Sequence, residues 1–318
     1  MIETSGLRKS FRTRSRRRTI TVDAVRGVDL TVGQGEIFGF LGPNGAGKTT
    51  TQRMLATLIV PDGGQAVIAG ADLRTSPGEV RRRIGYVAQG GGTWDDVSAH
   101  EELVMQARMH GFSKAEALAR AATAIAGFQI GDYADRLCKT YSGGQRRRLD
   151  IALGVIHSPR VLFLDEPTAG LDPASRVQVW DEVRRLRAAG MTIFVTTHYL
   201  DEADALCDRV AIIDQGTVVA EGTPDDLKRE VSGDVVVVGV NGTAPRAAEL
   251  LTGQSFVRRL EIRDESGLRL HVDAGSTAIP QILRALDGSD IELLAVEVSR
   301  STLDDVFLKK TGRSLQET

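Results

Sequence analysis

The sequence predicts an α/β fold with a mostly parallel sheet, and three observations support this prediction. Segments with the character of strands and helices alternate through the first two-thirds of the chain. Two strand candidates, residues 161–164 and 193–195, are apolar without alternation, as expected for strands that are covered on both faces. A glycine-rich loop separates the apolar run 37–41 from a helical segment, which is the strand–loop–helix order of a P-loop NTPase core.

The expected elements of this core follow one another in a regular order. Strands are expected at residues 26–32, 36–41, 83–87, 161–164, 192–196 and 210–214, and helices at 48–58, 99–109, 114–128, 144–156, 173–189 and 199–206. The stretch from about residue 95 to 158 contains no strand candidate. We therefore expect a helical insertion subdomain between two strands of the core.

Past residue 230 the order of the elements changes. A strand at 234–241, a helix at 245–251, strands at 256–263 and 268–273, a helix at 277–286 and a strand at 291–298 are expected. This βαββαβ order predicts a small ferredoxin-like α+β domain. A final short helix at 302–310 is expected to dock onto the core. The chain is thus expected to contain an ATP-binding-type domain, residues 1–230, and an accessory domain, residues 231–318.

The glycine-rich loop carries the phosphate-binding pattern G-x-x-x-x-G-K-[ST]. Its members are Gly42, Pro43, Asn44, Gly45, Ala46, Gly47, Lys48 and Thr49, and Thr50 follows them in the expected nucleotide site. The glycines let successive backbone N–H groups converge on phosphates at a helix N-terminus. Lys48 is expected to reach the β- and γ-phosphate oxygens, and the Thr49 hydroxyl to bind Mg²⁺. The loop therefore predicts ATP and Mg²⁺ as ligands.

Four polar side chains follow strands of the expected sheet. Asp165 and Glu166 end the apolar strand 161–164, where Asp165 is expected to hold Mg²⁺ and Glu166 to polarise the water that attacks the γ-phosphate. His198 follows another buried strand, and ligands bind at the carboxyl ends of parallel strands, so we expect it to contact the γ-phosphate. Gln89 is expected to complete the Mg²⁺ shell. The alternative for each is an ordinary structural or surface side chain.

Composition sets limits on the function. With 318 residues, 42% hydrophobic content and a net charge of −2, the whole chain has no strong preference for nucleic acid. One basic run stands out: Arg8, Lys9, Arg12, Arg14, Arg16, Arg17 and Arg18. It predicts either a solvated hairpin or a contact with acidic lipid headgroups or an acidic loop of a partner.

The absence of long apolar runs and the positions of the two cysteines bear on the location of the protein and on its redox state. No apolar run approaches the roughly 18 residues that span a bilayer, and a signal peptide is not apparent, so we expect a cytosolic protein. Cys138 and Cys207 fit no metal or redox spacing and are expected to be reduced thiols.

A second anion site is expected at Ser142, Gly143, Gly144 and Gln145, which precede an amphipathic helix. A P-loop, this SGGQ segment, the Asp-Glu strand end and the later His, in this order, resemble the ATP-binding subunit of an ABC transporter over about residues 5–230. The resemblance implies that the SGGQ segment of one subunit contacts the γ-phosphate held by the P-loop of the other. It also implies that Asp172 couples the two sites of a dimer and that Phe11 stacks on adenine.

The sequence departs from the common pattern of this family in three places. Tyr141 replaces the usual Leu before SGGQ, residues 12–18 lengthen the segment after Phe11, and glycines follow Gln89.

The C-terminal segment narrows the resemblance. Residues 301–308, Ser-Thr-Leu-Asp-Asp-Val-Phe-Leu, and residues 141–150 resemble the daunorubicin/doxorubicin-resistance type of ATP-binding subunit. That resemblance implies an ATPase that works as a homodimer, bound through a separate multi-span membrane subunit to the cytoplasmic face of the membrane, and that exports drugs, antibiotics or lipids. Two alternatives stay open, an importer subunit and a soluble ABC-type ATPase acting on nucleic acid or ribosomes. A single P-loop and the lack of a heptad run speak against the latter, so no nucleic acid partner is expected.

Overall fold

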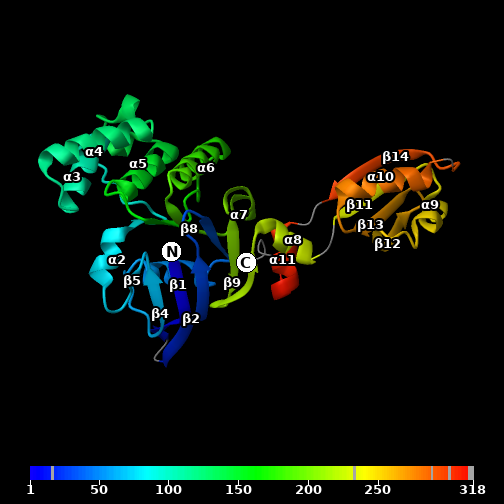
Figure 1. Ribbon diagram of the computed structural model, residues 1–318, viewed down its shortest axis with the longest axis horizontal. Coiled ribbons are helices and arrows are strands. Elements are labelled where there is room, and N and C mark those ends of the chain that lie inside the picture. Colours follow the sequence, from blue (N-terminus) through cyan, green and yellow to red (C-terminus); the bar gives the residue numbers. More distant parts are fainter. Residues whose placement is uncertain (16–17, 232–233, 288, 300–301, 314–318) are drawn as a thin grey trace. The chain divides into compact units, whose positions relative to one another are not determined.

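The computed structural model describes residues 1–15, 18–231, 234–287, 289–299 and 302–313. The chain divides into two compact units, Met1–Glu221 and Gly222–Glu317. The first unit contains two sheets and the second contains one, and helices pack on the sheets of each unit (Figure 1). The expected change after residue 230 falls near the end of helix α8 (Pro224–Val231), which this division assigns to the second unit.

A six-stranded sheet forms the centre of the first unit. Its strands, in the order β10-β9-β3-β8-β7-β6, are Thr217–Gly222, Arg209–Asp214, Ile37–Leu41, Thr192–Thr197, Val161–Asp165 and Ile84–Val87. Strand β3 pairs in parallel with β8 and β9, and β7 pairs in parallel with β6 and β8. Every residue of β3, β7 and β8 is buried, which explains their continuous apolar runs. The predicted parallel α/β core is confirmed.

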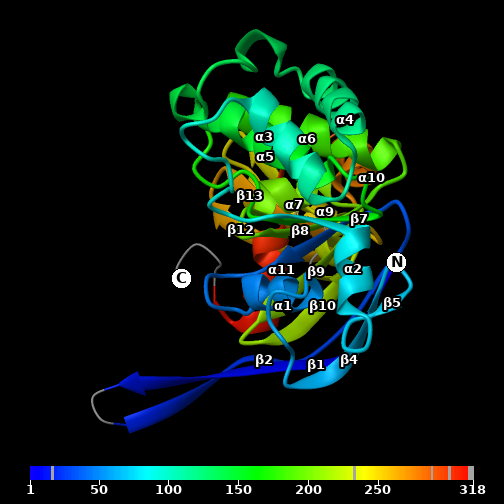
Figure 2. The same ribbon diagram turned by 90° about the vertical axis from the view of Figure 1, so that its left-hand side faces the viewer.

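A second, antiparallel sheet has the order β2-β1-β4-β5. Its strands are Arg18–Val32, Ile2–Ser15, Gly63–Ile68 and Ala71–Asp72. Strand β1 pairs with β4 only as far as Arg8, so beyond this residue β1 and β2 form a two-stranded ribbon that projects from the unit (Figure 2). The described residues of the basic run lie on β1 and β2, while Arg16 and Arg17 and the side chains of residues 13–19 lie outside the described part.

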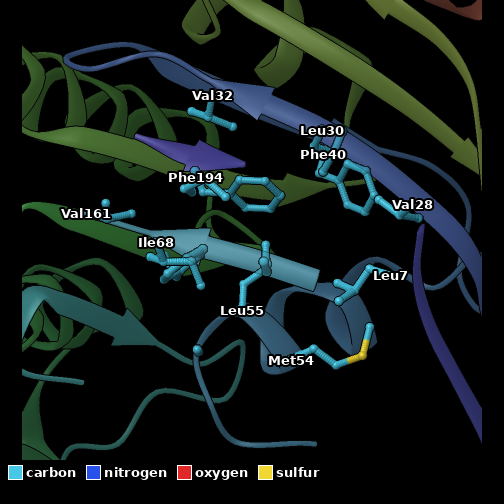
Figure 3. Packing of buried hydrophobic residues seen from close by; sticks show 14 of the residues in the cluster. Leu7, Val28, Leu30, Val32, Phe40, Met54, Leu55, Ile68, Val161 and Phe194 are labelled. Atoms are coloured by element: carbon cyan, nitrogen blue, oxygen red, sulfur yellow. The ribbon is translucent and has the colours of Figure 1, made fainter. Parts of the chain in front are cut away.

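The main core of the first unit lies where the two sheets face each other. Figure 3 shows Phe40 and Phe194 from the parallel sheet packed near Leu30 of β2 and Leu55 of α1 (Lys48–Leu55). The ring centroids of Phe40 and Phe194 are 5.6 Å apart. Burying a large apolar side chain stabilises a fold by about 1.5–3 kcal/mol. This packing fixes α1, and therefore the loop that leads into it, against the end of β3.

Helices make up the stretch between β6 and β7, which is fully described. They are α3 (Ala99–Met109), α4 (Lys114–Gly127) and α5 (Gly143–Val155), with two short 3-10 helices between α4 and α5. Ser98, Ser113 and Ser142 start these helices with capping boxes, in which a side chain three residues later bonds back to the cap. The predicted helical insertion is confirmed. The remaining helices of the unit are α2 (Pro77–Arg83), α6 (Pro173–Ala188) and α7 (Leu200–Leu206).

The second unit has the predicted βαββαβ order. Its elements are β11 (Val235–Val240), α9 (Ala244–Leu251), β12 (Val257–Asp264), β13 (Gly267–Val272), α10 (Gly275–Leu286) and β14 (Leu293–Ser299). The sheet order β12-β13-β11-β14 with antiparallel neighbours is that of a ferredoxin-like module.

The last helix, α11 (Leu303–Thr311), packs against α8 within the second unit. Its Leu303, Val306 and Phe307 are buried, and Lys309 Nζ donates a hydrogen bond to the Glu230 carbonyl at 3.0 Å.

Candidate functional site

The phosphate-binding loop runs from the end of β3 to the start of α1, and its shape requires glycine at two positions. Gly47 has φ +109°, and a Cβ there would lie 2.5 Å from the carbonyl oxygen of Ala24. A Cβ on Gly42 would lie 2.3 Å from the carbonyl oxygen of Ile213. Any side chain at either position would push the loop away from its neighbours. The structure therefore places the predicted cradle at the carboxyl end of β3.

Lys48 is buried beneath this loop. Its Nζ donates to the carbonyl oxygens of Gly42 at 2.6 Å and Pro43 at 3.1 Å, and lies 3.5 Å from Glu166 Oε1. Burial lowers the pKa of Lys48, while the neighbouring carboxylates of Glu166 and Asp165 oppose that shift. The loop thus holds a cation that faces both its own carbonyls and the acidic strand end.

Asp165 ends β7 and is fully buried. Its Oδ1 accepts hydrogen bonds from Thr49 Oγ1 at 3.0 Å and Thr196 Oγ1 at 2.7 Å. Its Oδ2 has no hydrogen-bond partner among the described residues. A buried carboxylate oxygen with a free lone pair beside a threonine hydroxyl is a donor set that suits a hard cation such as Mg²⁺.

Three predicted side chains converge on Glu166. Gln89 Nε2 donates to Glu166 Oε2 at 2.8 Å, His198 Nδ1 lies 3.2 Å from Oε1, and Lys48 approaches the same oxygen. Glu166 has φ +45°, a left-handed conformation that costs a residue other than glycine about 1–3 kcal/mol. The surrounding contacts hold the residue in this conformation, as is typical of functional sites.

The SGGQ segment begins helix α5. Ser142 Oγ accepts a hydrogen bond from the Gln145 N–H, and Gln145 Oε1 accepts one from the Ser142 N–H at 3.0 Å. Figure 2 draws α5 in the helical layer and α1 in a different part of the unit. Among the described residues no hydrogen bond or ion pair joins Ser142, Gly143, Gly144 or Gln145 to the P-loop of the same chain. A role of this segment at a phosphate therefore stays a prediction that involves a second subunit.

The two remaining predicted residues lie on the surface. Asp172 caps helix α6, where its Oδ1 accepts from the Ser175 N–H at 2.9 Å. Phe11 lies on the β1–β2 ribbon opposite Val22 and is 40% exposed. Lys9 Nζ lies 5.5 Å from the centre of the Phe11 ring. Neither contact tests a role in coupling or adenine stacking.

Sequence reasoning missed Arg147. This residue is only 5% exposed, and its guanidinium donates to the backbone carbonyls of Ala88 at 2.9 Å, Gln89 at 3.0 Å and Glu166 at 3.2 Å. It lies on the same buried face of α5 as Asp150, Ile151 and Gly154. In the sequence Arg147 stands between Arg146 and Arg148, and no local pattern distinguishes it from these neighbours.

A groove also lies beside the Gln89 loop. Its volume is about 370 Å³, and its lining includes Trp94, Glu102, Met109 and Asp150. Trp94 is 58% and Met109 76% exposed, whereas Glu102 is buried. Burial raises the pKa of Glu102 to about 7, and the nearby Asp150 adds to the shift.

A P-loop, a buried Asp-Glu strand end and a helical insertion on one parallel sheet define the class of ABC-type ATPases. The model of the ABC transporter family matches residues 25–169, and that of the DrrA1-3-like ATP-binding protein C-terminal domain matches residues 222–311. The daunorubicin/doxorubicin resistance ATP-binding protein DrrA of Streptomyces peucetius is 46% identical, covering 98% of this chain and 92% of that protein. The linearmycin resistance ATP-binding protein LnrL of Bacillus subtilis is 33% identical over 92% of this chain and 95% of its own length.

Solved structures agree with this class. A structure of an ATP-binding subunit of an ABC transporter, 27% identical, matches with a TM-score of 0.61 over 72% of this chain and 92% of that one. A dimeric ATP-binding cassette with ADP and Pi has the same fold, at 23% identity and a TM-score of 0.63 over 70% of this chain and 98% of that one. The chain belongs to the DrrA-like ATP-binding subunits of ABC transporters. It binds and hydrolyses ATP as the motor subunit of a transporter. In the described part of the chain, no helix has the length and apolar character to span a membrane.

Proposed function

We propose that two copies of this chain close on two ATP molecules and drive export through a separate multi-span membrane subunit. The convergence of Gln89, His198 and Lys48 on Glu166 is the observation that carries the proposal. Relatives named for resistance to daunorubicin, doxorubicin and linearmycin, and one named for Nod factor export in Burkholderia orbicola, support an export role for drugs, antibiotics or lipids.

Glu166 is the group that orients and polarises the attacking water. Its carboxylate is held from three sides, so it keeps one orientation at the end of β7. His198 lies beside it, and from there its imidazole would contact the γ-phosphate of bound ATP. Phosphoryl transfer depends mainly on positioning and charge stabilisation, which a fixed carboxylate and a buried lysine supply. Lys48 exchanges its loop carbonyls for β- and γ-phosphate oxygens when ATP binds.

The described residues fit a Mg²⁺ ion. Thr49 and Asp165 would hold it, with Gln89 completing the shell, and the unpartnered Oδ2 of buried Asp165 supports this assignment. When bound, Mg²⁺ neutralises charge on the β- and γ-phosphate oxygens. Thr196 keeps Asp165 in place, because its hydroxyl donates to the other carboxylate oxygen.

The dimer would complete each site from two subunits. Ser142, Gly143, Gly144 and Gln145 present the N-terminus of α5, whose first N–H groups lack intrahelical acceptors and favour an anion. Asp172 of α6 would transmit the state of one site to the other. The groove beside the Gln89 loop supports docking of a cytoplasmic segment of the membrane subunit, because exposed Trp94 and Met109 border it. That docking would hold the chain at the cytoplasmic face of the membrane.

The test uses a Glu166→Gln variant of the full chain. We expect it to bind ATP, to hydrolyse it about 10²- to 10⁴-fold more slowly and to accumulate as an ATP-bound dimer. Affinity isolation from detergent-solubilised membranes with ATP should then recover a multi-span membrane protein. Turnover at the wild-type rate would overturn the role of Glu166. Recovery of ribosomes or nucleic acid without a membrane protein would overturn the transport function.

A further inference from the structure

Helix α5 holds the backbone of two active-site loops through a single side chain. The Arg147 guanidinium donates to the carbonyls of Ala88 and Gln89, which follow strand β6, and to the carbonyl of Glu166, which follows β7. Two of these carbonyls belong to Gln89 and Glu166, whose side chains are joined by the 2.8 Å hydrogen bond. Arg147 therefore holds the backbone of both Gln89 and Glu166, the two residues whose side chains form this hydrogen bond.

Asp150 holds the next part of the same loop. It lies one helical turn after Arg147, and its Oδ1 accepts from the Gly92 N–H at 3.0 Å and from Thr93 Oγ1 at 2.7 Å. A Cβ on Gly91 would lie 2.6 Å from Asp150 Oδ2, so the loop packs directly on the carboxylate. One face of α5 thus grips residues 88–93 at both ends, with a cation at one end and an anion at the other.

Charge keeps this grip intact. Burial lowers the pKa of Arg147, and the negative charges of Asp150, Glu202 and Asp165 oppose that shift. Five donors in a planar fork let one guanidinium satisfy three carbonyls at once, which lysine does not reproduce. A substitution at this position leaves buried carbonyls without donors.

Ser142 is the N-cap of helix α5. The same helix therefore carries the SGGQ segment at its start and, through Arg147 and Asp150, contacts residues 88–93. We propose that Arg147 is a positioning residue that holds Gln89 and Glu166 in register and, together with Asp150, makes residues 88–93 and the SGGQ end of α5 move as one body. The inference rests on the proposed function in one respect, because the SGGQ end acts at the nucleotide of a second subunit. If the groove beside Gln89 is displaced, residues 88–93 and helix α5 would move together. The SGGQ segment would then shift against the ATP of the second subunit, with no movement of the P-loop in its own chain.

The test compares Arg147→Met and Arg147→Lys with Arg120→Met. Arg120 is a matched control, because its guanidinium donates to the Ile156 carbonyl at 2.9 Å and joins α4 to the end of α5 without touching either active-site loop. We expect Arg147→Met to lower kcat at least about tenfold with little change in the KM for ATP, and Arg147→Lys to restore part of kcat. Arg120→Met should keep the wild-type kcat, even if it lowers the melting temperature as much as Arg147→Met does.

Two further measurements separate positioning from general stability. In a Glu166→Gln background, Arg147→Met should lower kcat by no further factor, because it acts through Glu166. Amide exchange of residues 88–93 in the isolated chain should speed up in Arg147→Met and not in Arg120→Met. Equal kcat losses in Arg147→Met and Arg120→Met, additive losses with Glu166→Gln, or unchanged exchange of residues 88–93 would each overturn the inference. Failure to recover a membrane subunit would overturn the proposed function and leave these comparisons valid.

Discussion

The two units of the chain bury different kinds of side chain. In the first unit Lys48, Glu102, Arg147, Asp165 and Glu166 are all buried, together with several threonines. In the second unit no charged or polar residue of the described part is buried. Its core consists of apolar side chains from β11, β13, α9 and α10.

This difference indicates that the reaction takes place in the first unit. Burying a charged group costs free energy unless it is paired and hydrogen-bonded, so a fold retains such groups where a function needs them. In the first unit several of them gather at the ends of β3 and β7 and on the face of α5 that grips these loops. The second unit has no comparable cluster in its described residues.

The largest effect is expected from a cavity in the apolar core of the second unit. Leu270 on β13 is fully buried, so Leu270→Ala should cost this unit about 2–5 kcal/mol of its free energy of unfolding. ATP hydrolysis by the first unit should persist. Thermal unfolding followed by calorimetry, with ATPase assays on the same sample, checks both statements.

Leu294→Ala is the matched control, because Leu294 is 61% exposed on β14 and its loss should change stability by less than about 0.5 kcal/mol. If ATPase activity falls as the second unit unfolds, the first unit does not work independently of the second.

The parts of the fold that could be predicted from the sequence are those marked by a local pattern of apolar residues. Apolar runs located β3, β7 and β8, and the residues that follow them, Asp165, Glu166 and His198, lie together because parallel strands end at one edge. Strands β1 and β4 were missed. They lie in a sheet with exposed edges and faces, where charged and polar residues interrupt the apolar pattern.

The parts of the site that could not be predicted depend on contacts between distant segments. Arg147 reads as one more arginine in a basic triplet, and only the packing of α5 against β6 shows what its guanidinium reaches. Glu102 follows another glutamate on α3 and gives no hint of its burial. The trans roles of Ser142 and Asp172 need a second subunit, so a single chain shows only their helix-capping bonds.

The buried Glu102 makes the stability of the first unit depend on pH. Its pKa in the folded chain is about 7, raised from 4.5, so the folded state binds the proton more tightly than the unfolded state. Stability should therefore fall as pH rises from about 4.5 to 7 and then level off, by at most about 3 kcal/mol from this group. Glu102→Gln removes the titration. Melting temperatures of the two proteins should diverge progressively across that window.

The neighbouring Glu101 provides the control. Hydrogen bonds from Ser98 lower the pKa of Glu101, a shift in the direction opposite to that of Glu102. Glu101→Gln should leave the pH dependence of the melting temperature as it is in the wild type. Parallel curves for wild type and Glu102→Gln would show that Glu102 is not protonated in the folded chain.

The smallest effect is expected where the site uses an exposed side chain. Phe11 is proposed to stack on adenine, and an aromatic contact of this kind contributes about 0.5–1.5 kcal/mol. Phe11→Ala should therefore raise the KM for ATP by about 2- to 10-fold with kcat unchanged, and Phe11→Trp should restore it. Ile20 is a fair control, because it lies further along the same ribbon and is 47% exposed. If Ile20→Ala raises KM as much as Phe11→Ala, the ribbon acts through its general shape, and stacking by Phe11 is wrong.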